Sequence, residues 1–299
     1  MGVTAEEVRR AIRQPRPLAA WRRRIFNALG WGFSGLTFVL LGGAMVWILE
    51  MVFARGAGAM NWKVLTTITM GTGGGLLNAI EGTAVLALGG ILLSVPPGIA
   101  AGIYLAEFPG GFLAPVIRFL TDVLVGVPSI VVGYFAYVTL VVDMGWEFSV
   151  MAGSIALAII SMPYIVRTSE VAIRAVPNTL REAGHALGAT PGTVIMRICI
   201  PMALPSIMTG VLLALAISVG ETAPLIYTAG WSSYMWNGQM THAPIGYLTY
   251  VIWSFITEPF ESAHALAYAA AFFVTFFVLI ISVASRAVLY RRAGWSQGH

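Results

Sequence analysis

Arg167 and Glu170 form the pair of side chains in this sequence best suited to handling a charged solute. They are three positions apart, so on a helix they share one face. The guanidinium group of arginine is a planar fork that matches an oxyanion, and Glu170 can hold it while no anion is bound. Charged residues within membrane segments are costly and usually mark a function. The alternative interpretation is that Arg167 only anchors a helix end among lipid headgroups.

Glu221 and Thr222 follow another long apolar segment and form a second polar position. Because a carboxylate repels an anion, we expect Glu221 to pair with a cation or to cap a neighbouring helix. Asp122 lies four residues after Arg118, and this spacing predicts a local helical ion pair. Hydroxyl groups can donate to a passing oxyanion without adding charge, and four lie in or beside apolar segments: Ser129, Ser161, Thr168 and Ser218.

Enzyme chemistry and metal binding have no support in the sequence. The HExxH and GxSxG motifs are absent, His242 and His264 are far apart, and Cys199 is the only cysteine. We therefore predict no catalytic residue and no metal site. The glycine-rich run Gly71–Gly75 lacks the Lys-Ser or Lys-Thr of a phosphate-binding loop, so we interpret it as an external linker. With no nucleotide motif, no cofactor is predicted, and any ATP must be hydrolysed by a partner.

The composition predicts an integral membrane protein. Of the 299 residues 58% are apolar and only 10% are charged, whereas about 25% are charged in soluble domains. The basic residues lie in short gaps between apolar runs, a pattern that does not indicate nucleic-acid binding. A membrane-crossing helix needs about 20 apolar residues. We predict an all-α fold with six transmembrane helices: Ile25–Leu49, Gly82–Ala106, Val123–Val142, Phe148–Val166, Ile198–Gly220 and Ala265–Ser285.

Prolines lie within several of these predicted helices. Pro96 and Pro97 are expected to interrupt the second helix, Pro128 the third and Pro163 the fourth, while Pro201 and Pro205 stand at the start of the fifth. The interruptions are either ordinary kinks or the lining of a translocation path.

The segment Thr222–Thr257 is uncharged and rich in Gly, Pro, Ser, Thr and Trp. Its one dense apolar run, Ile245–Ile256, has only twelve residues. That length suits an interfacial or re-entrant helix better than a seventh crossing.

The distribution of basic residues predicts the orientation in the membrane. Fifteen of the 17 basic residues fall on one side if the N-terminus is inside, and only Arg55 and Lys63 lie outside. Both termini are therefore expected to be cytoplasmic. Residues 1–24 are interpreted as a basic arm, helical from Ala5 to Arg24 and lying on anionic headgroups. Residues 25–290 are the membrane domain, and residues 291–299 are a cytoplasmic tail.

The longest internal connection, residues 167–197, carries a short predicted helix. Pro177 is a helix start, and Asn178 to Glu182 open the helix. Small residues follow, and Pro191-Gly192 is expected to end it. Small side chains between Pro and Gly let another protein approach the backbone closely.

The residues of this connection resemble the cytoplasmic signature of ABC importer permeases. That signature reads E-A-A/G, three residues, G, nine residues, I-x-L/I-P. The chain has Glu182-Ala183-Gly184, then Gly188, then Ile198-Cys199-Ile200-Pro201 at the same spacings. The resemblance implies a type I importer permease whose coupling helix, within about 177–201, seats in a groove of an ATPase subunit. The residues it assigns to this contact are Glu182, Ala183, Gly184, Gly188, Ala189 and Pro191.

Further motifs resemble the A-type permeases of phosphate-specific importers, from about Asn78 to the C-terminus. They include Asn78–Thr83, Gly102–Glu107, Val127–Gly133, Arg167–Glu170 and Gly220–Leu225. The resemblance implies phosphate import across a bacterial plasma membrane, with Arg167 and Glu170 beside the anion. It also implies a non-identical second permease, two ATP-binding subunits and an extracytoplasmic phosphate-binding protein. The segment Thr222–Thr257, with Trp231, Trp236 and Trp253, is a candidate docking shelf for that protein.

Two positions depart from this pattern. Ile217 stands where relatives usually have an arginine, one helical turn before Glu221, and Glu81 stands at a usually apolar position. Another oxyanion, such as phosphonate, sulfate or molybdate, therefore remains an alternative substrate. The remaining alternatives are an ion-coupled secondary transporter, for which the sequence has no convincing internal repeat, and an intramembrane enzyme.

Overall fold

The computed structural model describes residues 17–293, with side chains over residues 21–286. The chain divides into two compact units, Met1–Ala54 and Arg55–His299, and each is described by itself. Helix α2 (Pro17–Ala59) contains nearly all described residues of the first unit. Its stretch Trp21–Ala59 is apolar and long enough to cross a membrane, which agrees with the first predicted span. Residues 1–16 of the predicted basic arm lie outside the described residues, and Pro17–Arg24 continue directly into α2.

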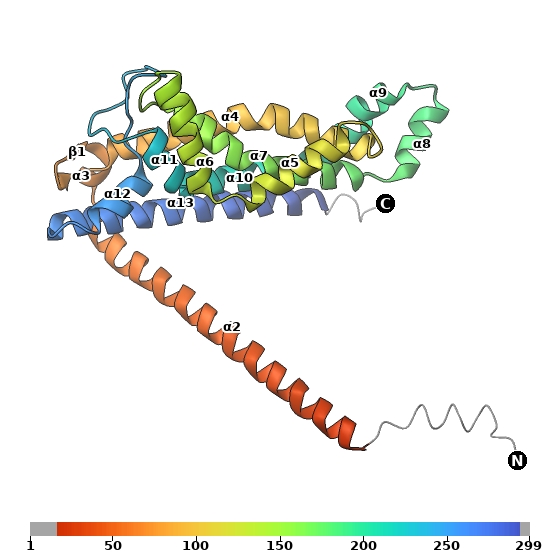
Figure 1. Ribbon diagram of the computed structural model, residues 1–299, viewed down its shortest axis with the longest axis horizontal. Coiled ribbons are helices and arrows are strands. Elements are labelled where there is room, and N and C mark those ends of the chain that lie inside the picture. Colours follow the sequence, from red (N-terminus) through yellow and green to blue (C-terminus); the bar gives the residue numbers. More distant parts are fainter. Residues whose placement is uncertain (1–16, 294–299) are drawn as a thin grey trace, which may run out of the picture. The chain divides into compact units, whose positions relative to one another are not determined.

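The second unit is a bundle built mainly from four long helices (Figure 1). Helix α4 (Leu77–Glu107) packs along α7 (Val150–Arg174), and α10 (Ile200–Gly220) packs on both of them. Helix α13 (Glu261–Ala293) lies against α10. The remaining elements are α3 (Trp62–Thr66), β1 (Thr69–Met70), β2 (Gly73–Gly74), α5 (Ala114–Gly126), α6 (Ser129–Ala136), η1 (Tyr137–Asp143), α8 (Asn178–Ala186), α9 (Pro191–Val194), η2 (Ile195–Cys199), α11 (Ala223–Thr228) and α12 (Leu248–Phe255).

The α4–α7 contact is close because small residues face each other along it. A Cβ atom added at Gly102 would lie 2.5 Å from the Cβ of Ser169, so no larger residue fits there without a shift. Beside this contact, Ile165 and Ile173 of α7 join Cys199 and Ile207 in a buried apolar cluster between α7 and α10. The bundle therefore positions the charged residues of α7 against α4 on a rigid support.

Among the described residues, five helices are long and apolar enough to cross a membrane, and the number is six if a bent helix pair is counted as one span. This confirms the predicted membrane bundle, but the third span is not the straight helix expected over Val123–Val142. Helices α5 and α6–η1 meet at an angle of 104°. Val127, the residue before Pro128, is extended with ψ 128°, as the clash with a following proline ring requires.

The other prolines do not break their helices, so the expected breaks at these positions are absent from the described residues. Helix α4 runs through Pro96 and Pro97, α7 runs through Pro163, and α10 runs through Pro205 without a break. A proline removes one backbone hydrogen bond, which costs about 3 kcal/mol in an exposed helix. Each of these three helices packs against the other two, and this packing outweighs the lost bond.

The segment after α10 forms two short helices, α11 and α12, rather than a seventh crossing. Helix α12 has eight residues, too few to span a membrane and in agreement with the expected short helix. The glycine-rich run Gly71–Gly75, predicted to be an external linker, lies in the connection between α3 and α4. It completes a small antiparallel hairpin in which Thr69 pairs with Gly74.

Candidate functional site

Glu170 of α7 is the centre of a charge cluster. Its side chain is only 7% exposed, and three arginines surround it. Its carboxylate oxygens lie 2.8 Å from Arg174 Nη2, 3.3 Å from Arg118 Nη2 and 3.8 Å from Arg167 Nη1. A buried carboxylate is costly unless paired, and the three guanidinium groups supply this pairing for Glu170. We name Arg118, Asp122, Arg167, Glu170 and Arg174 the arginine cluster.

The predicted local pair of Arg118 and Asp122 on α5 is wrong. Arg118 instead reaches across to Glu170 on α7, and Asp122 accepts a hydrogen bond from Arg167 Nη2 at 2.8 Å. Arg118 and Asp122 pair with α7 rather than with each other, because the buried Glu170 needs several donors. An exposed ion pair between residues one helical turn apart, such as Arg118–Asp122, would be weak. Arg167 is therefore shared between an exposed carboxylate, Asp122, and a buried one, Glu170.

Arg167 also borders open space. Its side chain is 54% exposed, and with Thr168 and Ser206 it lines a groove of about 330 Å³. Thr168 does not donate into this groove, because its hydroxyl bonds to the carbonyl oxygen of Tyr164 at 2.8 Å. The groove thus presents one cation with unused donor capacity to an incoming anion.

Ser129 and Glu221 form a separate polar contact. The Ser129 side chain at the start of α6 lies beside the Glu221 carboxylate, and Thr249 donates to the Glu221 backbone carbonyl at 2.8 Å. Thr222 is the residue immediately before α11 and lines a second open groove with Thr249 and Trp253. Over the described residues, no ion pair or hydrogen bond joins this contact to the arginine cluster.

Ser218 is turned away from any open groove. Its hydroxyl lies 2.8 Å from that of Ser161 and donates to the carbonyl oxygen of Ala214 at 3.0 Å. Both serines are buried, at 3% and 1% exposure. Together they form a polar link between α7 and α10.

The segment expected to dock a partner forms a helix–turn–helix, from α8 to α9. Helix α8 begins at Asn178, directly after Pro177, as predicted. It ends at Ala186, before the predicted stop, because Gly188 turns the chain with φ +81°. Pro191 is the first residue of α9 rather than the end of α8.

The residues of the signature divide between the inside and the surface of this segment. Gly184 is buried, and a Cβ atom there would lie 2.8 Å from Ile198 Cδ1. Glu182, Ala183 and Gly188 are exposed, and Ala189 is half-buried. Leu187 is 90% exposed, an unusual position for a leucine in the absence of a partner. Helices α8 and α9 lie at one end of the second unit, and α3, β1 and α12 lie at the other (Figure 1).

The family of the chain follows from a match to a family model. Residues 98–293, which include the arginine cluster and the α8–α9 segment, match the binding-protein-dependent transport system inner membrane component. The chain belongs to this family of transport permeases.

Relatives of this permease are named for phosphate transport. It is 43% identical to phosphate transport system permease protein PstA 2 of Mycobacterium bovis, over 96% of this chain and 97% of the relative. It is 38% identical to phosphate transport system permease protein PstA of Yersinia pestis, over 91% and 92% of the two chains.

A solved structure shows the same fold. The permease resembles an inward-facing conformation of the MetNI methionine ABC transporter, with a TM-score of 0.58 and 20% identity. The match covers 72% of this permease and 94% of that chain. The fold is therefore that of a type I ABC importer permease, and the protein is a multi-pass membrane protein.

At the end of the permease opposite α8, side chains of α4 hold the loop before α12. Asn78 is buried, accepts a hydrogen bond from Thr69 N at 3.0 Å and donates to the carbonyl oxygen of Ser232 at 2.9 Å. Glu81 accepts a hydrogen bond from the backbone N–H of Trp236 at 3.0 Å. The unusual acid at position 81 therefore fixes this loop rather than facing the arginine cluster.

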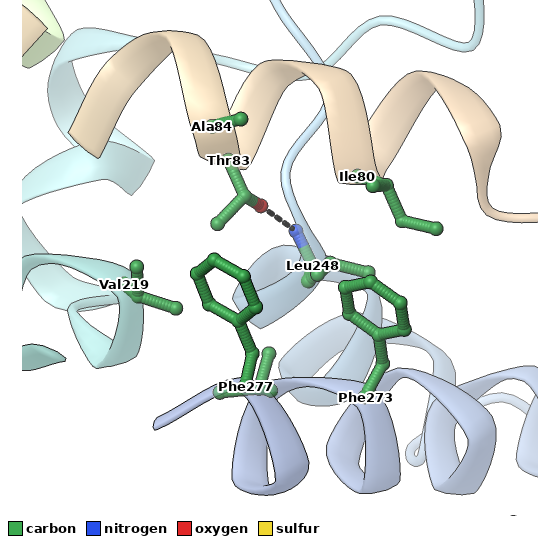
Figure 2. Close-up of a pocket in the computed structure, with 8 residues that line it drawn as sticks. Ile80, Thr83, Ala84, Val219, Leu248, Phe273 and Phe277 are labelled. Carbon is green, nitrogen blue, oxygen red and sulfur yellow. Dashed lines mark hydrogen bonds between the residues drawn. The ribbon is translucent and has the colours of Figure 1, made fainter. Parts of the chain in front are cut away.

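Thr83 makes the third bond of this set. Figure 2 shows its hydroxyl accepting a hydrogen bond from the N–H of Leu248, at 2.9 Å, beside a cavity of about 100 Å³. The rings of Phe273 and Phe277 project from α13 toward α4 across this cavity (Figure 2). Its lining is apolar except for Thr83, so it suits neither an anion nor a metal ion.

Sequence reasoning found Arg167 and Glu170 but gave no role to Arg174. The signal was present, because Arg174 lies four residues after Glu170 on the same helix face. It also missed the bonds from Asn78 and Glu81 to the loop. Those bonds join residues more than 150 positions apart, and no local spacing indicates them.

Proposed function

We propose that this chain is the membrane permease subunit of an ATP-driven importer of inorganic phosphate. The observation that carries the proposal is the 43% identity to a protein named as a phosphate transport permease, over nearly the full length of both chains. Similarity of that extent covers the arginine cluster, the α8–α9 segment and the loop between α11 and α12 together.

The arginine cluster supports a tetrahedral oxyanion as the substrate. Arg167 has one exposed carboxylate partner, Asp122, and borders the groove that contains Thr168 and Ser206. A phosphate ion can replace Asp122 on Arg167, because a bidentate contact to guanidinium serves both groups equally. Meanwhile Arg118 and Arg174 stay paired with the buried Glu170.

The α8–α9 segment supports coupling to an ATPase subunit. Leu187 and the turn at Gly188 are exposed at the end of the bundle. We propose that they seat in a groove of the ATPase, that two such subunits hydrolyse ATP, and that this chain is itself non-catalytic and carries no cofactor. A second, homologous permease provides the other wall of the path, and an extracytoplasmic phosphate-binding protein delivers the anion.

The charge distribution supports an orientation in a bacterial plasma membrane. The end of the bundle that carries α8 is the arginine-rich one, so we place it, with both termini, in the cytoplasm. The loop between α11 and α12 then faces outward. Its exposed Tyr234, Met235 and Met240 offer an uncharged contact surface for the binding protein.

The test is uptake of labelled phosphate by cells that lack their own importer and express this chain with its neighbouring subunits. We expect uptake with the wild type and none with Arg167→Gln, although the complex still assembles. Arg286→Gln is the matched control, because Arg286 is exposed and makes no ion pair among the described residues. Uptake of sulfate, molybdate or a phosphonate in place of phosphate would assign the alternative oxyanion. Full phosphate uptake without the ATPase would instead assign a secondary transporter.

A further inference from the structure

Arg181 joins helix α8 to the ends of two membrane helices. Its Nη1 donates to Oε1 of Glu107, the last residue of α4, at 2.5 Å. Its Nη2 donates to the carbonyl oxygen of Ile173, in the last turn of α7, at 2.8 Å. The side chains of Arg181 and Glu107 are only 19% and 13% exposed. One guanidinium group therefore contacts both helices that form the main packed pair of the bundle.

Holding α8 through a buried ion pair costs free energy. This cost indicates that the exact position of α8 is important. A carboxylate at the C-terminal end of a helix lies at the negative end of the helix dipole, so Glu107 is unfavourable there without a cation. Removing two charges from water also costs free energy that the pair only partly returns. Only arginine can bond to a carboxylate and to a separate carbonyl oxygen in one plane. The pair fixes α8 more specifically than apolar packing would.

The same helix ends lead to the arginine cluster. Arg174 Nη2 donates to the carbonyl oxygen of Leu105 at 3.1 Å, two residues before Glu107. Arg174 Nη2 also lies 2.8 Å from Glu170, whose carboxylate contacts Arg167. Polar contacts, joined by the α4 backbone between Leu105 and Glu107, thus connect α8 to the residue proposed to meet the anion.

Helix α8 has a second, independent anchor. Gly184 packs against Ile198 and Val194, which connects α8 to α9 and to η2, the segment that leads into α10. Loss of the Arg181–Glu107 pair would leave α8 attached through this apolar contact. ATPase docking and transmission to α4 and α7 can therefore be separated by mutation.

We infer that the Arg181–Glu107 pair is the positioning element that transmits a displacement of α8 to α4 and α7, and through them to the arginine cluster. The inference rests on the proposed function, because α8 is displaced only if an ATPase docks on it. It assigns Arg181 and Glu107 to energy coupling rather than to anion binding.

The test follows the movement and does not depend on the substrate. A reporter cysteine replaces Ser206, which lines the groove beside Arg167, in a Cys199→Ser background. Its rate of labelling by a soluble maleimide is compared in the purified complex with and without trapped nucleotide. We expect nucleotide to change the rate in the wild type, and Arg181→Gln or Glu107→Gln to reduce that change about tenfold. The retained amount of ATPase should stay the same.

The double variant Arg181→Gln/Glu107→Gln should be no worse than Arg181→Gln alone, because Arg181→Gln already removes the Arg181–Glu107 interaction. Arg286→Gln is the charge-matched control and should respond to nucleotide like the wild type. A nucleotide response that survives in Arg181→Gln, or that falls only in proportion to lost ATPase, would overturn the inference. Failure of the wild type to import phosphate would defeat the proposed substrate and leave this readout unaffected.

If Arg181→Gln does not assemble, a second variant decides the matter. Cysteines at positions 181 and 107, joined by a flexible, cleavable thiol cross-linker, would hold α8 to α4 without charge. Because the pair is inferred to move as one body with α4, the cross-linked complex should keep its nucleotide response. Loss of the response on cross-linking, with recovery when the linker is cleaved, would show that the two helices separate during the cycle and would contradict the inference.

Discussion

The two ends of the second unit are held by different kinds of interaction. The α8 end, which contains the arginine cluster and the Arg181–Glu107 pair, is held by ion pairs between α4, α5, α7 and α8. The α12 end is held by Asn78, Glu81 and Thr83 of α4, which bond to backbone groups of the loop 231–248. A charged partner can be exchanged for an ion, whereas a backbone bond fixes one loop conformation. We therefore expect charged side chains to exchange ionic partners at the α8 end, and the loop at the α12 end to present a fixed surface.

The largest effect should come from Glu170, at the centre of the α8 end. Glu170→Gln keeps the shape but leaves three arginines without their shared carboxylate. We expect a loss of about 3 kcal/mol in the free energy of unfolding, the lower part of the range for a broken buried pair because the arginines are partly exposed. Thermal unfolding of the purified permease in detergent measures the loss. An unchanged unfolding temperature would show that the arginine cluster makes no net contribution to the stability of the permease.

Asn78 should produce the next largest effect, at the α12 end. Asn78→Ala removes the acceptor of Thr69 N and the donor to Ser232 O, both in a buried position. Unpaired buried polar groups cost about 1–3 kcal/mol, and we expect about 2 kcal/mol. Proteolysis of the loop 231–248 should accelerate in this variant while nucleotide response at the α8 end is kept. Equal damage at both ends would break the distinction between them.

Hydropathy and local signals predicted much of the α8 end and little of what links distant segments. Pro177 is a local conformational signal that located the start of α8. The end of α8 was predicted at Pro191-Gly192 and lies at Ala186, before the turn at Gly188. The bend at Pro128 and the unbroken helix through Pro96 and Pro97 have the same local signal and opposite outcomes. Packing against neighbouring helices decides between them, and a single sequence does not display that packing.

The pairing of the charged residues likewise depends on tertiary contacts that local spacing does not indicate. Spacing correctly placed Arg167 and Glu170 on one helix face, because that relation is local. It failed for Arg118 and Asp122, whose partners lie 52 and 45 positions away. Burial of Glu170, which depends on the tertiary fold, changes which pairing has the lower energy. Local periodicity therefore finds the elements, and burial decides how their charges pair.

A smaller effect is expected at the turn that follows α8. Gly188 has φ +81° and open space around it, so Gly188→Ala meets only backbone strain, about 1 kcal/mol. We expect reduced retention of the ATPase, and loss of retention with the bulkier Gly188→Trp. Gly192→Ala is the matched control, because Gly192 also has open space but no positive φ. Normal ATPase retention in Gly188→Trp would refute the assignment of this turn to docking.

The smallest effect on the free energy of unfolding should come from Glu81→Gln. A small effect there would best support the difference between the α8 end and the α12 end. Glu81 acts as a hydrogen-bond acceptor for Trp236 N, and the amide oxygen of glutamine can accept the same bond. Glu81→Gln should therefore change the free energy of unfolding by less than about 0.5 kcal/mol, whereas Glu81→Leu should cost about 1 kcal/mol.

The loop itself supplies the second readout for Glu81. A cysteine replacing Ser233, in a Cys199→Ser background, should cross-link to the binding protein equally well in the wild type and in Glu81→Gln, because both keep the bond to the loop backbone. Cross-linking should be weaker in Glu81→Leu, which has no acceptor. The same chemical change, carboxylate to amide, would then be severe at Glu170 and silent at Glu81. A large loss in Glu81→Gln would mean that charge also matters at the α12 end, and the two ends would no longer differ in kind.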